Sequence, residues 1–185
     1  TYTPYVILRN ILENPGWYTS YTPYQPEVAQ GRLEMLLNFQ QMIIDFTGMD
    51  IANASLLDEG TAAAEAMGLC NRLDKMDKKI VFISVDCHPQ TIEVIKTRAE
   101  PLGLKVIIGN DNELSNLSED IICGILQYPG TLGDIKDPSE NISKIKKKNG
   151  KAILVCDLLS LAKLKTPAEL GADIAVGSSQ RFGIP

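Results

Sequence analysis

The sequence predicts an α/β fold in which a mostly parallel sheet is flanked by helices. Five short apolar runs recur after residue 77, and helical patterns or turn residues separate them. The runs are apolar at nearly every position, which is typical of parallel strands buried on both faces. A chain of 185 residues with 44% hydrophobic residues is long enough to bury such a core in one domain.

The first residues are predicted to form an extended arm outside this core. Residues 1–32 contain four of the ten prolines and five of the six tyrosines. Each proline fixes its own φ angle and disfavours the helical conformation of the preceding residue. We therefore divide the chain into a Pro/Tyr-rich arm, residues 1–32, and a domain, residues 33–185, which is expected to be incomplete at its C-terminal end.

Two helices are predicted before the first apolar run. From Leu33, apolar residues recur at helical spacing until Gly48 stops the pattern, so a long amphipathic helix is expected. The alanine-rich segment 61–73 predicts a second helix, with Asp58 before it as a capping residue. Both helices are therefore available to cover the sheet.

Strands and helices alternate along the rest of the chain. A capping box at residues 166–169 opens a short helix, and Asp137 and Gly150 are expected to cap and stop an earlier one. The predicted helices are 89–100, 138–149 and the short helix that begins near 167. The predicted strands are 80–85, 105–108, 121–126, 152–157 and 174–176.

Composition excludes several kinds of partner. A formal charge of −5 and a pI near 4.9 argue against nucleic acid and anionic membranes, and no run is long enough to span a bilayer. The basic run 144–148 ends a predicted helix, where cations complement the helix dipole. With one histidine and no zinc-knuckle spacing, we expect no metal site and reduced thiols of an intracellular compartment. The thiols are Cys70, Cys87, Cys123 and Cys156.

Polar residues follow four of the apolar runs directly. Ligands of open α/β sheets bind outside the carboxyl ends of the strands, so these residues could face one crevice. They are Asp86, Cys87 and His88, then Gln127 and Tyr128, then Asp157, and finally Ser178, Ser179 and Gln180.

Residue types alone leave the roles of these positions open. His88 precedes a proline and could be a turn or capping residue, and Asp157 could be functional or structural. The turn 58–61 could bind a phosphate on the free N–H groups of a helix start. However, the carboxylates of Asp58 and Glu59 would repel a phosphate, so capping is the stronger interpretation.

Four motifs stand out along the chain. They are YTPYQPE at 21–27, ASLLDEGTAAAEA at 54–66, DCHPQT at 86–91 and GSSQRFGIP at 177–185. With these motifs the chain resembles the P-protein family of the glycine cleavage system. The resemblance implies the large-domain fold of fold-type I enzymes, which are similar to aspartate aminotransferase, and pyridoxal phosphate as the cofactor.

The same resemblance indicates which half of the P-protein this is. Enzymes of this fold pair a strand-end aspartate with the pyridine nitrogen and carry a Schiff-base lysine further along the chain. Asp157 matches the aspartate, but Gln180 stands at the place of the lysine, 23 residues later. Glutamine forms no Schiff base, and Lys163 and Lys165 fall at the wrong place in the pattern. The chain thus resembles the amino-terminal half, with no catalytic residue of its own.

For the whole enzyme, the resemblance implies decarboxylation of glycine and transfer of the aminomethyl group to the lipoyl arm of H-protein. The expected partners are the carboxy-terminal, pyridoxal-phosphate-bearing half and lipoylated H-protein. The full chain would form a dimer, or a heterotetramer where the halves are separate subunits. The location would be mitochondrial in a eukaryote and cytoplasmic in a bacterium, and this piece alone is expected to be inactive.

Residues of the arm are the main candidates for reaching the cofactor or substrate on the other half. A proline-fixed segment presents hydroxyl and amide groups at low entropic cost, although packing between the halves is an equally open role. The cofactor- or substrate-proximal candidates are Tyr21, Thr22, Tyr24 and Gln25 of the arm, together with His88 and Asp157.

Two alternatives from other classes stay open at this point. A degenerate half could be a scaffold that only stabilises its partner and contacts no cofactor. A Rossmann-type nucleotide-binding domain is disfavoured, because no G-x-G-x-x-G or P-loop motif follows an apolar run.

Overall fold

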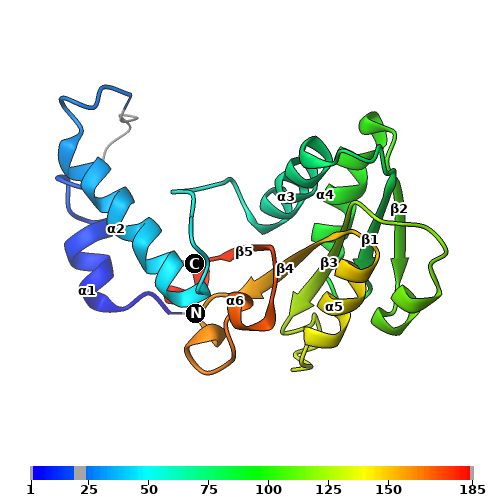
Figure 1. Ribbon diagram of the computed structural model, residues 1–185. Helices are drawn as coiled ribbons and strands as arrows, with labels where there is room; N and C mark the ends of the chain where they lie inside the picture. Colours follow the sequence, from blue (N-terminus) through cyan, green and yellow to red (C-terminus); the bar gives the residue numbers. More distant parts are fainter. Residues whose placement is uncertain (1, 19–23, 184–185) are drawn as a thin grey trace.

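The computed structural model describes residues 2–18 and 24–183, and a five-stranded sheet lies at its centre (Figure 1). The strand order is β2-β1-β3-β4-β5, and all neighbouring strands are parallel. The predicted fold class is thereby confirmed, and each predicted strand is present. The third strand is shifted, because it begins at Cys123 and not at residue 121, so Gln127 and Tyr128 lie inside the strand and do not follow it as predicted. The strands are β1 (Ile80–Ser84), β2 (Lys105–Gly109), β3 (Cys123–Tyr128), β4 (Lys151–Asp157) and β5 (Ile174–Ser178).

Helices cover both faces of the sheet, as strands that are apolar on both sides require. The helices α3 (Glu59–Leu73) and α4 (Pro89–Ala99) pack together and cover one face, and α5 (Ser139–Lys147) packs on the other. Successive strand residues point to opposite faces, so Ile83 belongs to the first core and Phe82 to the second. Both side chains are fully buried.

The chain reverses its direction across the sheet between β1 and β3. From β1 it moves outward to β2, and it then returns past β1 to β3, β4 and β5. At such a point the loops that leave the two neighbouring strands diverge at their carboxyl ends, which is where ligands of open α/β sheets bind. The carboxyl edge of the sheet is therefore the place to look for a site.

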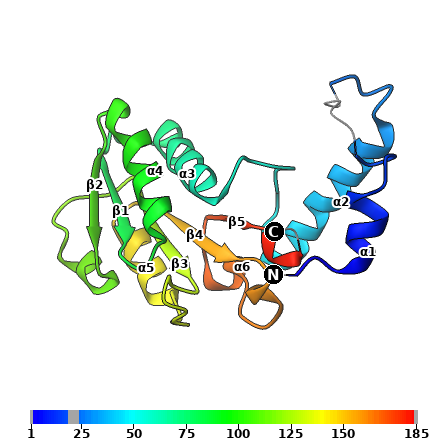
Figure 2. The ribbon, with the colours of Figure 1, turned by 180° about the vertical axis from the view of Figure 1, so that it is seen from behind.

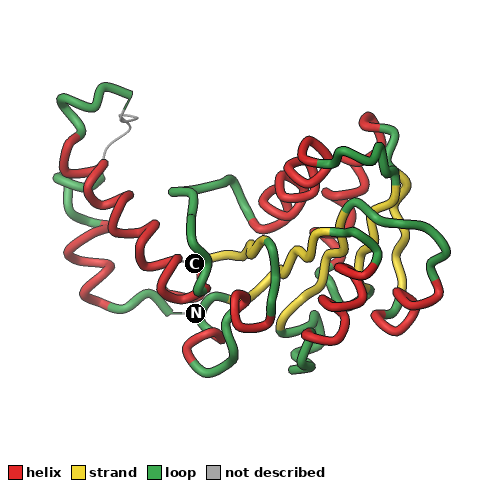
Figure 3. Tube along the Cα trace, in the orientation of Figure 1, coloured by secondary structure: helices red, strands yellow, loops and turns green. Residues whose placement is uncertain are grey.

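The amino-terminal segment contains helix, which corrects the expectation of an extended arm over residues 1–32. Tyr5–Ile7 form α1, a π-helical turn follows at Leu8–Leu12, and α2 (Gln30–Thr47) begins three residues before Leu33. The described prolines of this segment, Pro4, Pro15 and Pro26, lie outside the helical turns, so they do not prevent helix where apolar residues recur at helical spacing. Figures 1 and 2 show α1 beside α2 at one side of the sheet, and Figure 3 shows the helical turns in red.

We call the segment from α1 to the end of α2 the α1–α2 arm, or simply the arm. The carboxyl end of α2 joins this arm to the rest of the molecule. Gly48 ends α2 in a left-handed conformation, with φ of 70°, as expected for a helix stop. A side chain at Gly48 would collide with α6 (Pro167–Leu170). The ring of Phe46 lies 5.4 Å from that of Phe182 in the last turn, η5 (Gln180–Phe182). The arm is thus packed against the end of the chain.

The caps of α5 differ slightly from the prediction. The helix begins at Ser139 with Pro138 in the cap position, and Asp137 accepts the Ser139 N–H at 2.9 Å from one residue further out. After the helix, Asn149 and not Gly150 has the positive φ, of 54°. The capping box that opens α6 is present as predicted.

Candidate functional site

The loops that leave β1 and β3 are joined at the carboxyl edge of the sheet. Thr131 donates both its N–H and its hydroxyl to the carbonyl oxygen of Asp86, at 2.9 and 2.8 Å. The Asp86 carboxylate pairs with Lys136 Nζ at 2.8 Å. The two loops on either side of the direction change are therefore held together by three polar contacts.

His88, the residue before α4, belongs to the same network. Its Nδ1 lies 3.0 Å from Thr131 Oγ1. Because that hydroxyl donates its hydrogen to Asp86, it accepts from His88, and the network assigns a hydrogen to Nδ1. Nε2 then faces Glu59 Oε1 at 3.8 Å. The imidazole is thus held on both sides, although it makes no capping hydrogen bond to α4.

Glu59 is the first residue of α3 and brings that helix to the same edge. Burial raises the pKa of its carboxyl above the ordinary value. The nearby His88 opposes this shift, and the negative charges of Asp157 and Asp58 add to it. Glu59 therefore links the start of α3 electrostatically to the ends of β1 and β4.

Asp157 ends β4, and residues of this chain already engage both of its carboxylate oxygens. Oδ2 accepts from Arg181 Nη1 at 2.7 Å, and Oδ1 accepts from the Leu159 N–H at 3.2 Å. Arg181 lies in η5, where the neighbouring Gln180 is exposed. Asp157, which the resemblance pairs with the pyridine nitrogen of the cofactor, thus forms an ion pair with Arg181.

The start of α3 is closed by its own cap. Asp58 Oδ1 accepts the Thr61 N–H at 2.7 Å, and this hydrogen bonding lowers the pKa of the Asp58 carboxyl. An N–H group that could have bound a phosphate is therefore taken. The geometry agrees with capping, the stronger of the two interpretations drawn from the sequence.

Gln127 lies in β3, one residue before the carboxyl end of that strand. It is paired with Val155 of β4, whose side chain belongs to the core beneath α3 and α4, so both face that side. Its Oε1 is buried and has no hydrogen-bond partner among residues 2–18 and 24–183. A buried acceptor without a donor is costly and marks a position that the fold alone does not satisfy.

The described arm candidates, Tyr24 and Gln25, lie on the surface of this chain. Tyr24 is 86% exposed, and Gln25 is also exposed. Both precede α2, which Figures 1 and 2 show at one side of the sheet. Tyr21 and Thr22 lie outside the described residues. A cofactor or substrate that these side chains touch would have to belong to another part of the enzyme.

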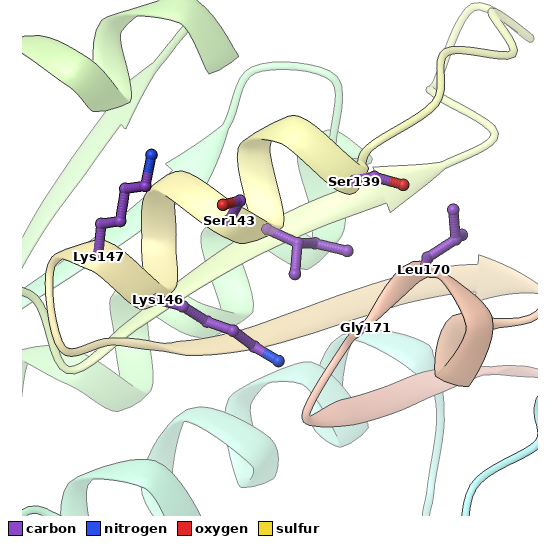
Figure 4. A pocket seen from close by; sticks show the side chains of 7 residues that line it. Ser139, Ser143, Lys146, Lys147, Leu170 and Gly171 are labelled. Atoms are coloured by element: carbon purple, nitrogen blue, oxygen red, sulfur yellow. The ribbon is translucent and has the colours of Figure 1, made fainter.

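Two surface hollows lie away from Asp157 and Glu59. The first, of about 440 Å³, lies between α5 and α6, and Figure 4 shows Lys146 and Lys147 on its helix. The second, of about 580 Å³, lies where β1 and β2 end and is lined by Asp86, Val85, Ile108, Leu132 and others. Of the side chains that the sequence predicts near a cofactor, the described ones, Tyr24, Gln25, His88 and Asp157, line neither hollow.

Sequence reasoning missed several members of this cluster. Thr131 and Lys136 lie in a loop whose pattern gives no sign of its contact with β1. Glu59 was considered only as part of a cap. Arg181 could have been found, because it adjoins Gln180 in the motif that lacks the lysine.

Other functional groups are limited in the described parts of the chain. In these parts no three His, Cys, Asp or Glu side chains are grouped to hold a metal ion, and no helix is long and apolar enough to cross a membrane. The four cysteines are buried free thiols. Burial raises the pKa of Cys87, and raises that of Cys156 to about 12, so neither is a thiolate at neutral pH.

The parallel sheet, its two helical layers and the aspartate at the end of β4 define the large-domain fold of fold-type I pyridoxal-phosphate enzymes. A crystal structure of the cystine C-S lyase C-DES with its product cysteine persulfide matches the chain with a TM-score of 0.68. The match covers 95% of this chain and 50% of that one at 16% identity, so it concerns the fold alone.

Within this class, the chain belongs to the family of glycine cleavage system P-proteins, whose family model matches residues 1–185. It is 83% identical over its whole length to glycine dehydrogenase (decarboxylating) of Pelagibacter ubique, and 57% identical to that of Aliivibrio fischeri. It spans only 19% of the length of each. A crystal structure of an inhibitor-bound glycine decarboxylase (P-protein) matches all of this chain and 42% of that one, with a TM-score of 0.89 and 33% identity.

The strand-end residues do not fit a covalently bound pyridoxal phosphate. Gln180 offers no amine for a Schiff base, and the Asp157 carboxylate already holds Arg181. At the start of α3, Asp58 occupies an N–H group, and Glu59 adds a carboxylate where a phosphate would need positive potential. At the strand-end positions that the structure describes, Gln180 supplies no amine, the Asp157 carboxylate is already ion-paired, and one N–H group of the α3 start is already bound.

Proposed function

We propose that this chain is part of the amino-terminal half of a P-protein that decarboxylates glycine and transfers the aminomethyl group to the lipoyl arm of H-protein. The match of the family over the whole chain supports this proposal, as does the activity in the names of its relatives. When bound, pyridoxal phosphate supplies an electron sink for the loss of CO2. In this proposal the other half binds it.

The ion pair of Asp157 with Arg181 is the observation that assigns cofactor binding to the other half. In a cofactor-binding half its carboxylate would be free to meet the ring nitrogen, and a lysine would follow. Here Arg181 takes the carboxylate at 2.7 Å, and the exposed Gln180 replaces the lysine. His88 and Asp157 thus hold loops of this chain together, and the Schiff-base lysine lies elsewhere in the enzyme.

Borohydride reduction of the full-length enzyme tests this assignment. Reduction locks a Schiff base onto its lysine, and mass spectrometry of the peptides then locates the modified residue. We expect a modified lysine outside residues 1–185. Modification of Lys163, Lys165 or another lysine of this chain in stoichiometric yield would show that the roles are assigned wrongly.

The arm is proposed to reach the active site of the other half through Tyr21, Thr22, Tyr24 and Gln25. A pure scaffold role is the second candidate, and it is favoured by the exposure of Tyr24 on the surface of this chain. Turnover and stability respond differently to the two roles, so substitutions in the arm separate them.

The proposed partners are the pyridoxal-phosphate-bearing half and lipoylated H-protein. A full-length chain would pair as a dimer, and separate halves would assemble as a heterotetramer. The named relatives are bacterial, which supports a cytoplasmic location, and a mitochondrial location would apply only to a eukaryotic source.

A further inference from the structure

We infer that Arg181 is an internal substitute for a ligand cation at the end of β4, and that it fixes the position of the α1–α2 arm through η5. Arg181 is a positioning residue in this inference. Only the use of the arm by another half rests on the proposed function. The ion pair and its neighbours belong to this chain alone.

The geometry of the ion pair at Asp157 supports this inference. Its side chain is 20% exposed and that of Arg181 is 62% exposed, so the guanidinium covers the rim of the strand-end site. A guanidinium is a planar cation with N–H donors in its plane. It therefore gives the carboxylate what a protonated ring nitrogen would give, and no ligand is needed to neutralise Asp157.

The turn η5 and the glycine after it lie against both helices of the arm. Directly after Arg181, the ring of Phe182 packs against Phe46 near the end of α2. Gly183 follows with φ of 110°, and a Cβ there would lie 2.7 Å from Pro4 Cδ and 3.6 Å from Ile7 Cδ1. Three successive residues thus connect β4, α2 and α1.

The ion pair is expected to stabilise the arm more than the sheet. Exposed ion pairs contribute little to global stability, because water screens them and both side chains lose freedom. Loss of Arg181 is therefore expected to leave the sheet folded. The ion pair is one of several contacts that hold the arm, beside the Phe46–Phe182 ring contact and the packing of Gly48 on α6. One such contact has a larger share in holding a peripheral segment than in holding the core, since peripheral segments open with much lower free energy.

Hydrogen exchange with mass spectrometry on the full-length enzyme measures this effect. Arg181→Ala should raise exchange about two- to fivefold in peptides from α1 and from the end of α2, and leave β1 and β3 unchanged. The matched control is Arg98→Ala, which removes the exposed pair of Arg98 with Glu65 between α4 and α3. That control should leave the arm unchanged.

Chemical rescue tests the substitution of a ligand cation directly. Millimolar methylguanidinium should restore slow exchange to the arm of Arg181→Ala, and sodium chloride of equal ionic strength should not. In the double variant Asp157→Asn with Arg181→Ala, methylguanidinium should have no effect, because the carboxylate that binds it is absent.

Three results would overturn the inference. They are unchanged exchange in the arm of Arg181→Ala, faster exchange in all five strands together with the arm, and absence of rescue by methylguanidinium. None of them depends on where borohydride places the cofactor, so this inference and the proposed function can fail separately.

Discussion

At the residue scale, Gly177 in β5 is the described glycine at which an added Cβ would come closest to another atom. A Cβ at this position would lie 2.1 Å from the carbonyl oxygen of Cys156 on the neighbouring β4. Neither strand can move without breaking ladder hydrogen bonds, so Gly177→Ala should destabilise the protein by about 1–3 kcal/mol. Urea unfolding followed in this part of the enzyme measures the loss.

Gly31 provides the matched control for that substitution. It lies in α2, and no atom lies within 4 Å of a Cβ built there. Because alanine favours helix over glycine, Gly31→Ala should stabilise the helix by about 0.5–1 kcal/mol. Equal effects of the two substitutions would show that the close approach at Gly177 is relieved without cost.

Tyr24 and Gln25 decide between a catalytic and a purely interfacial arm. If their hydroxyl and amide groups place substrate or cofactor on the other half, Tyr24→Phe or Gln25→Leu should slow turnover strongly. Loss of one catalytic donor costs on the order of 3 kcal/mol in the barrier. Glycine–bicarbonate exchange, normalised to bound cofactor, measures turnover beside a melting curve.

Tyr18→Phe is the control for the arm, since Tyr18 is exposed and lies outside the motif at 21–27. It should change neither turnover nor melting. A lowered melting temperature with unchanged exchange activity for the Tyr24 and Gln25 variants would assign the motif to an interface, where a lost hydrogen bond costs only about 1 kcal/mol of stability.

At the element scale, the start of α5 should respond to acid through Asp137. Hydrogen bonds from Ser139, with a smaller effect of Lys165, lower the pKa of the Asp137 carboxyl from 3.8 to about 2. A carboxyl whose pKa is lower in the folded state stabilises the fold above pH 3.8, and this contribution is lost as the pH falls through about 2. The charge of Asp137 should therefore matter at neutral pH and not in strong acid.

Asp137→Asn tests this effect, because asparagine keeps the acceptor oxygen and does not titrate. We expect the variant to be less stable than the parent protein at pH 7, with a difference that shrinks between about pH 4 and pH 2. Denaturant midpoints across this range provide the measurement. A difference that stays constant with pH would exclude a role for the charge.

The strands were predictable because each one carries its signal locally. Residues buried on both faces read as unbroken apolar runs, and such runs need no knowledge of their neighbours. The arm was harder, because its prolines dominate the composition of residues 1–32 although none interrupts the helical turns at Tyr5–Ile7 and Leu8–Leu12. Position relative to a helix matters more than the number of prolines.

The candidate site was predictable only in part, for a related reason. His88 and Asp157 follow strands, and strand ends meet at one edge by topology. Their partners Thr131 and Arg181 come from segments 43 and 24 residues further along the chain. Contacts over such separations are set by the tertiary structure, so a local sequence pattern does not predict them.

At the scale of the whole molecule, the arm and the loops expose large apolar side chains. The many large apolar side chains that this chain exposes would be covered in an interface of the full enzyme, so residues 1–185 expressed alone should self-associate. Sedimentation velocity measures the association. Exposed apolar side chains of α1, α2 and the loops include Tyr5, Val6, Leu37, Ile51, Leu57 and Leu132, at 62 to 90%.

A charged arm surface should weaken that association. Val6→Lys with Leu37→Lys removes two of the exposed apolar side chains of α1 and α2 and leaves the sheet untouched. This variant should sediment more slowly than the unmodified chain at equal concentration. A monodisperse monomer for the unmodified chain would contradict the assignment of these helices to an interface.

If Arg181 neutralises Asp157 as inferred, the stability of this part should not depend on the supply of pyridoxal phosphate. A ligand stabilises its binding site by an amount that grows with its free concentration, whereas a tethered arginine cannot be diluted away. In cells short of pyridoxal phosphate, the lysine-bearing half should loosen while residues 1–185 keep their shape. Hydrogen exchange of the apo and holo enzymes should therefore differ outside this chain and agree within it, away from any contact with the cofactor-bearing half. The apoenzyme would then keep a folded platform on which returning cofactor can restore activity without refolding of the whole protein.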